Sequence, residues 1–96
     1  MTKYDIITTL KKQKTHMRDS FGVSSIGLFG SYAVDKQTKH SDIDIYVEFY
    51  NKTFDNIAGL WNYLERLFDK KIDLIHKHKN SNQIVIGNIQ REVIYG

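Results

Sequence analysis

The sequence has no cysteine and no proline among its 96 residues. Without cysteine, the chain can form neither a disulfide framework nor a catalytic thiolate. It has no apolar run of about eighteen residues that could cross a membrane, and its first residues lack the apolar core of a signal peptide. We therefore expect a soluble, cytoplasmic protein without a membrane-spanning segment.

An excess of one charge is also nearly absent, since 14 Lys and Arg stand against 11 Asp and Glu and leave a net charge of +3. So small an excess fits contact with phosphates and fits a lysine-rich soluble surface. The chain contains no internal repeat, low-complexity segment or visible linker. A chain of this length builds one core, so residues 1–96 are expected to form a single domain.

The spacing of apolar residues predicts the elements of this domain. Apolar residues three or four positions apart predict helices, and alternation of apolar and polar residues predicts strands. The expected helices cover residues 2–20, 54–68 and 83–95, the expected strands cover residues 23–29, 42–49 and 71–75, and a helical turn with a loop covers residues 32–40. The apolar residues 84–86 at the start of the last predicted helix could also form a strand. This order predicts an α/β (α+β) fold, a small mixed sheet with helices packed on one face.

Two carboxylates stand on the most regular strand, shortly after a glycine–serine turn. Gly30 and Ser31 follow the first predicted strand, and Asp42 and Asp44 open the second. A strand has a side-chain period of two, so both carboxylates point to one side while the intervening apolar residues point to the other. Neighbouring carboxylates repel each other, and a divalent cation between them removes that repulsion.

A third carboxylate, Asp73, interrupts the apolar alternation of the last predicted strand. If that strand lies beside the one carrying Asp42 and Asp44, the three carboxylates form an all-oxygen site suited to Mg²⁺ or Mn²⁺. Two such ions activate an attacking hydroxyl and stabilise a leaving pyrophosphate. Gly30 would let backbone amides approach a phosphate closely, and the Ser31 hydroxyl would add a donor.

Each of these residues also has a purely structural interpretation. Asp42 and Asp44 could belong to a solvated strand face, and Asp73 could be a single exposed acid. Ser31 could be a turn residue or a helix cap. The combination of Gly-Ser with Asp-x-Asp favours the functional interpretation.

Aromatic and imidazole side chains near the motif are less specific. Tyr32 and Tyr46 either pack in the core or stack on a nucleotide base. His76 and His78 have no third ligand nearby, so a polar loop is expected there rather than a zinc site.

The motif Gly30-Ser31, ten intervening residues and Asp42-Ile43-Asp44 resembles the signature of the DNA polymerase beta-like nucleotidyltransferase superfamily. The flanking strand residues 28–29 and 45–49 are also similar to that superfamily. The short length and residues 89–95 resemble its minimal members, the MNT-domain proteins, which are antitoxins paired with HEPN-domain ribonuclease toxins.

The resemblance implies a nucleotidyltransferase-like fold and the transfer of AMP from ATP to a hydroxyl, in the antitoxin branch a tyrosine of the toxin. It implies that Gly30 and Ser31 hold the nucleotide phosphates and that Asp42 and Asp44 bind two Mg²⁺ ions. Asp73 would bind the catalytic ion and help deprotonate the acceptor hydroxyl. The implied partners are ATP and a HEPN-domain toxin, with no membrane and no direct nucleic-acid contact.

The chain departs from the family pattern just after the Gly-Ser motif. Many relatives carry Arg-Gly where this chain has Val34-Asp35. Loss of a cation and gain of an acid should weaken triphosphate binding unless Lys36 or Lys39 substitutes. Two alternatives therefore stay open: an antitoxin that neutralises its toxin by complex formation alone, and a nucleotidyltransferase for a small molecule such as an aminoglycoside, although such enzymes usually add a second domain.

Overall fold

The computed structural model describes residues 1–78 and 81–96. Its elements are, in chain order, α1 (Lys3–Lys12), α2 (Lys14–Phe21), β1 (Val23–Phe29), α3 (Gly30–Ala33), β2 (Ile43–Phe49), α4 (Phe54–Phe68), β3 (Ile72–His76), α5 (Gln83–Glu92) and β4 (Ile94–Tyr95). The strands and the helix predicted at the centre of the chain are confirmed to within one residue at each end. His76 ends β3 instead of starting the predicted loop.

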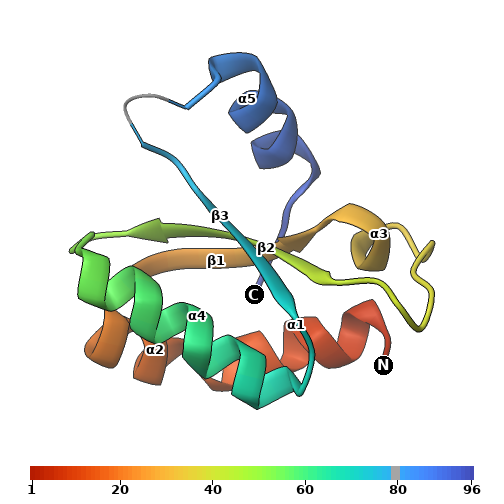
Figure 1. Ribbon diagram of the computed structural model, residues 1–96, viewed down its shortest axis with the longest axis horizontal. Coiled ribbons are helices and arrows are strands. Elements are labelled where there is room, and N and C mark those ends of the chain that lie inside the picture. Colours follow the sequence, from red (N-terminus) through yellow and green to blue (C-terminus); the bar gives the residue numbers. More distant parts are fainter. Residues whose placement is uncertain (79–80) are drawn as a thin grey trace.

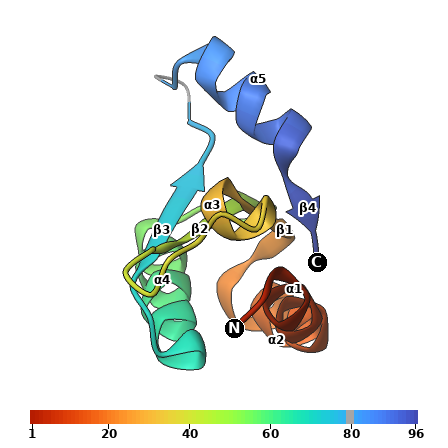
Figure 2. The same ribbon diagram turned by 90° about the vertical axis from the view of Figure 1, so that its right-hand side faces the viewer.

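The strands form one mixed sheet in the order β3-β2-β1-β4 (Figure 1). β2 pairs antiparallel with β1 and parallel with β3, and β4 pairs antiparallel with β1. Helices α1, α2 and α4 cover one face, whereas α5 lies over the opposite face (Figures 1 and 2). The α/β fold class is therefore confirmed, but the expectation that all helices pack on one face is wrong for α5.

The core lies between the sheet and the helices α1, α2 and α4. Ile43, Ile45 and Val47 of β2 are fully buried on this face and meet Leu60 and Leu64 of α4. Burial of each such side chain contributes about 1.5–3 kcal/mol. The alternation in β2 thus directs its apolar residues into the core and leaves its acidic residues on the α5 side.

The first predicted helix is in fact two helices. Thr2 begins α1 with a capping box in which its side chain and that of Asp5 bond reciprocally to the backbone. At Gln13 the backbone leaves the helical conformation, with φ −97° and ψ 4°, and α2 then runs to a left-handed Gly22. A break of one residue barely changes the phase of the apolar pattern, so periodicity alone predicts a continuous helix.

The C-terminal helix is shorter than predicted, because α5 ends at Glu92 and Ile94–Tyr95 form β4. β4 pairs with Gly27 and Leu28 of β1. A Cβ atom at Gly27 would lie 2.6 Å from the nearest Val93 methyl and 2.7 Å from the Ile94 carbonyl oxygen. The missing side chain at Gly27 therefore lets the last residues pair with the sheet. Within the described residues, no helix is long and apolar enough to cross a membrane.

Candidate active site

Strand register brings the predicted site residues to one end of the sheet. Phe29 at the end of β1 pairs with Asp44, and Asp44 pairs in turn with Asp73 of β3. Neighbouring strands lie about 4.7–4.9 Å apart, so the two carboxylates stand side by side on one face. The condition set by the sequence, that the strand of Asp73 should lie beside that of Asp44, is met.

Gly30 fits tightly against the Asp44 carboxylate. It has a φ of +74°, and a Cβ atom on it would lie 2.0 Å from Asp44 Oδ2. Glycine is the residue that takes this conformation without strain and leaves room for the carboxylate. The backbone N–H of Ser31 lies near the Asp44 carboxylate and lowers its pKa. Both residues of the Gly-Ser motif thus lie beside Asp44, and their role toward phosphates stays a prediction.

Electrostatics couple the three acids. Partial burial raises the pKa of Asp44, and the negative charges of Asp73 and Asp42 raise it further, whereas the Ser31 N–H lowers it. Asp42 is exposed and lies immediately before β2. Asp44 is partly buried and Asp73 is exposed, and a hydrogen bond between their side chains adds to the rise in the pKa of Asp44.

The donor set fits a hard divalent cation. All side-chain ligands would be carboxylate oxygens, and a cation would relieve the repulsion that raises the pKa of Asp44. Among the described residues, no group of three or more His, Cys, Asp or Glu side chains is already arranged to hold a metal ion.

Asp35, which stands where the resemblance leads us to expect glycine, has a backbone conformation that favours glycine. Its φ is 59°, in the left-handed region that Asp tolerates better than most residues. Its carboxylate forms an ion pair with Lys3, with 3.2 Å between Nζ and Oδ2. The added negative charge is thus held by α1.

Lys70 is a cation near the motif that sequence reasoning missed. Its ammonium lies 6.0 Å from the centroid of the Tyr32 ring and donates to the Lys39 carbonyl oxygen at 3.5 Å. Lys36 and Lys39, the predicted substitutes, are exposed. No local pattern in the sequence indicates this position of Lys70, because its contacts are with residues more than thirty positions earlier.

The two tyrosines are packing residues. Tyr32 is 4% exposed and Tyr46 is fully buried, so neither presents a free ring to a nucleotide base. The Tyr46 hydroxyl donates to Glu48 at 3.1 Å and accepts from Gln90 at 3.0 Å. Burial raises the pKa of Tyr46. This network joins α5 to β2, and no local pattern in the sequence indicates it.

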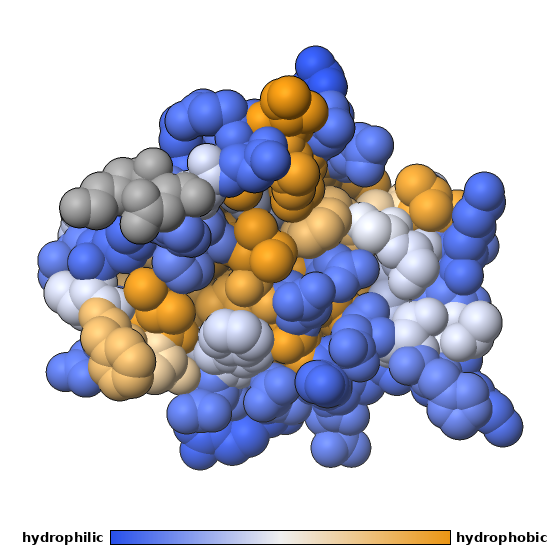
Figure 3. All heavy atoms as spheres, turned by 45° about the horizontal axis from the view of Figure 1, so that its top comes forward, coloured by the Kyte–Doolittle hydropathy of each residue, from blue (hydrophilic) through white to orange (hydrophobic). Residues whose placement is uncertain are grey.

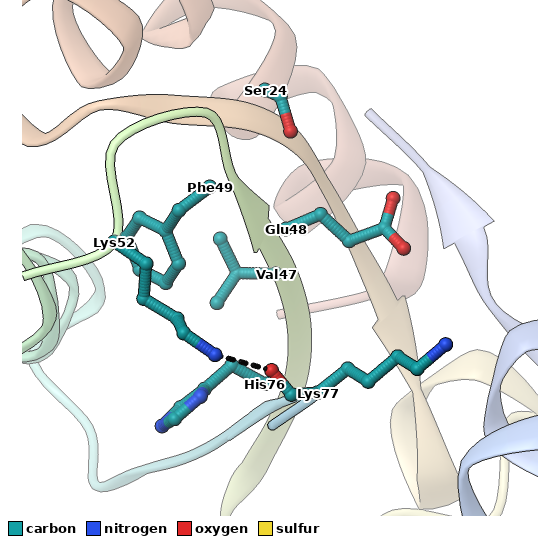
Figure 4. Close-up of a pocket in the computed structure, with 7 residues that line it drawn as sticks. All are labelled: Ser24, Val47, Glu48, Phe49, Lys52, His76 and Lys77. Atoms are coloured by element: carbon teal, nitrogen blue, oxygen red, sulfur yellow. Dashed lines mark hydrogen bonds between the residues drawn. The ribbon is translucent and has the colours of Figure 1, made fainter. Parts of the chain in front are cut away.

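A hollow of about 350 Å³ lies at the other end of β2 (Figure 4). It is lined by Ser24, Val47, Glu48, Phe49, Lys52, His76 and Lys77. Lys52 donates to the Lys77 carbonyl oxygen at 2.7 Å, and burial with the charge of Lys52 lowers the pKa of His76. The hollow contains none of the three predicted aspartates, so it is separate from the candidate active site.

A profile of the family described as polymerase beta, nucleotidyltransferase, matches residues 4–96. The chain belongs to this nucleotidyltransferase family. The match covers the Gly-Ser motif and all three aspartates. It confirms the predicted superfamily, the nucleotidyltransferase fold and the enzyme class.

Curated relatives of this nucleotidyltransferase align over almost the whole chain. The Methanocaldococcus jannaschii protein named "Putative protein adenylyltransferase MJ1379" is 41% identical over 97 residues, which are 98% of this chain and 97% of that protein. Protein adenylyltransferase MntA of Thermococcus cleftensis is 34% identical over 96 residues, which are 99% of this chain and 96% of that protein.

Solved structures give the same fold. "Structure of putative minimal nucleotidyltransferase" superposes with a TM-score of 0.73 over 92% of this chain and 93% of the other, at 24% identity, which supports the fold alone. A toxin–antitoxin structure with AMP-PNP superposes with a TM-score of 0.65 over 99% of this chain and 72% of the other, at 27% identity.

Proposed function

We propose that this nucleotidyltransferase is a magnesium-dependent protein adenylyltransferase that moves AMP from ATP to a tyrosine hydroxyl of a HEPN-type toxin. It would act in the cytoplasm as the antitoxin of a toxin–antitoxin pair. The observation that carries the proposal is the register of Asp44 with Asp73, next to the close contact between Gly30 and Asp44.

The relatives support this choice of substrate. Those that match over nearly the whole chain are named as protein adenylyltransferases, one of them MntA. A toxin–antitoxin complex with an ATP analogue shares the fold at 27% identity. These names favour a protein acceptor over a small molecule such as an aminoglycoside.

In the proposed reaction the acceptor oxygen attacks the α-phosphorus of ATP, and the bond to the bridging oxygen breaks so that pyrophosphate leaves. Asp73 takes the proton of the acceptor hydroxyl, which requires an unprotonated carboxylate beside that oxygen. Asp42 and Asp44 would hold two Mg²⁺ ions with Asp73, and the ions supply charge stabilisation for the attacking and leaving oxygens. Gly30 and Ser31 orient the phosphates.

The test is incubation of the chain with α-labelled ATP, Mg²⁺ and the purified product of the neighbouring gene. Label should appear on that product, and Asp42→Asn combined with Asp44→Asn should abolish it. Asp19→Asn is the matched control, because Asp19 is an exposed carboxylate of α2 paired with Arg18. Equal labelling by the double variant would exclude a catalytic role for these aspartates.

The second candidate is an antitoxin that acts through complex formation alone, and Val34 in place of a cation favours it. The double Asp→Asn variant separates the two functions. If it still protects cells fully from the toxin, binding alone is sufficient. Loss of protection together with loss of labelling supports the enzyme.

A further inference from the structure

β3 is an edge strand whose outer side is only partly covered. Lys71, just before it, accepts a hydrogen bond from the Ile43 backbone at 3.1 Å and therefore faces β2. The next residue, Ile72, faces away: its N–H donates to Glu65 at 3.2 Å and its carbonyl accepts from Trp61 at 2.8 Å. Two side chains of α4 thus close the first position of the outer edge.

Beyond Ile72, the outer edge has no backbone hydrogen-bond partner within the described residues, where Leu74 is 4% exposed and His76 is half-buried. Backbone groups of a strand alternate between its two sides, so Leu74 and His76 face outward like Ile72. Within the described residues, no hydrogen bond from outside the sheet reaches the backbone of Leu74 or His76. Unpaired N–H and C=O groups on an edge are a template for another strand.

A hollow lies beside this edge on each face of the sheet. On the α4 side, Trp61, Lys71 and Ile72 contribute to a hollow of about 410 Å³. On the α5 side, Ile75 and Val85 contribute to one of about 380 Å³. Figure 3 shows apolar side chains gathered between α5 and the sheet, and Val85 is 51% exposed. An added strand would turn alternate side chains into the two hollows.

The outer edge of β3 lies beside the candidate active site. Asp73 lies on β3 between Ile72 and Leu74 and shares the α5 side with Asp44. A side chain opposite Asp73 on an added strand would have its Cβ atom about 4.5–5.5 Å from that of Asp73. A hydroxyl on that side chain would therefore be delivered to the carboxylate.

We propose that the protein whose hydroxyl is adenylylated presents it on an extended segment that pairs with the outer edge of β3. This inference rests on the proposed function and names how its acceptor binds. The segment carries acidic residues, because lysines stand at both ends of the edge. Lys71 lies just before β3, and Lys77 lies just after it with Lys52 bonded to its carbonyl oxygen.

Amide hydrogen exchange of the full chain, with and without the purified neighbouring-gene product and a non-hydrolysable ATP analogue, tests the proposal. In the free chain, the Leu74 and His76 amides should exchange fast while those of Asp73 and Ile75 are protected by β2. The product should slow exchange at Leu74 and His76 at least roughly ten-fold, as paired edge amides are protected. Unchanged exchange in a formed complex would overturn the proposal. Concentration-dependent protection without the product would assign the edge to a second copy and also overturn it.

Two substitutions at His76 provide a second, independent test of the proposal. His76→Pro removes the outward N–H, which an edge strand tolerates, whereas His76→Val removes only the imidazole. Labelling of the product by His76→Pro should be roughly ten-fold or more below that by His76→Val, since one hydrogen bond and the fit of the added strand are lost. Binding of a fluorescent ATP analogue checks the fold of both variants.

The outcomes separate this proposal from the proposed function. If the unaltered chain labels nothing, the adenylyltransferase function fails, and the exchange experiment still tests edge pairing. If the unaltered chain labels its partner and both His76 variants do so equally, the edge proposal alone fails.

Discussion

The contact between Gly30 and Asp44 predicts a specific effect of Gly30→Ala. A left-handed conformation costs a residue with a Cβ about 1–2 kcal/mol. The new methyl would lie 2.0 Å from Asp44 Oδ2, so the carboxylate must move by about 1 Å or more. A displacement of that size in a catalytic group can lower the rate about 100-fold. We expect a loss of about 1–3 kcal/mol in the free energy of unfolding and a large loss of AMP transfer.

Two other glycines make this experiment discriminating. Gly22 has a φ of +68°, and its Cβ would lie 2.8 Å from the Asn51 carbonyl oxygen, far from Asp44 along the sheet. Gly22→Ala should therefore lower stability to a similar degree and leave AMP transfer intact. A methyl group added at Gly87 in α5 would meet no atom within 4 Å, so Gly87→Ala should gain about 0.5–1 kcal/mol.

Urea unfolding and transfer of labelled AMP measure the two effects. Each kcal/mol also corresponds to a shift of about 4–8 °C in Tm for a domain of this size. Full AMP transfer by Gly30→Ala, or a loss of transfer in Gly22→Ala as large as in Gly30→Ala, would contradict this prediction. Either result would mean that the tight contact with Asp44 does not position the carboxylate.

Further predictions concern the charges, the polar network and a helix cap. The raised pKa of Asp44 means that the folded state holds its proton more tightly, so stability falls as pH rises from about 3.9 through the raised value. Asp44→Asn should lack this fall in stability and show a higher Tm than the unaltered chain at pH 7. Mg²⁺ should raise the Tm of the unaltered chain but not that of the variant. Scanning calorimetry measures both effects. Tyr46→Phe should cost about 1–3 kcal/mol, because Glu48 and Gln90 lose their shared partner, and urea unfolding measures it. Thr53→Ala removes the side-chain cap of α4 and should cost about 1 kcal/mol by the same assay, and a neutral result would contradict the capping role.

Local patterns predicted the parts of the fold that depend on local rules. The strict alternation of β2 predicted both its core face and its acidic face, since a strand has one side-chain period. Thr53 was recognisable as the cap of α4, and the fifteen residues of that helix carry a broad apolar stripe. Gly30 was recognisable as a special position, although its contact with Asp44 was not.

Other features depend on contacts that no local pattern contains. The pairing of β4 with β1 requires Gly27, which lies far from it in sequence. α5 lies on the face opposite α1, α2 and α4, where Gln90 donates to the hydroxyl of the distant Tyr46. The ion pair of Lys3 with Asp35 joins α1 to the loop after α3 and changes the expected effect of that acid on the site.

The residues alone predicted a candidate site, from the Gly-Ser turn and three carboxylates, and an α/β fold, from the order of the apolar patterns. Only the folded chain establishes that Asp73 pairs with Asp44, that Asp35 forms an ion pair with Lys3, and that β3 is an edge strand beside the site. The two kinds of information differ because side-chain chemistry and strand period are local properties. Strand order, register and edge exposure depend instead on which distant segments bury their apolar faces together.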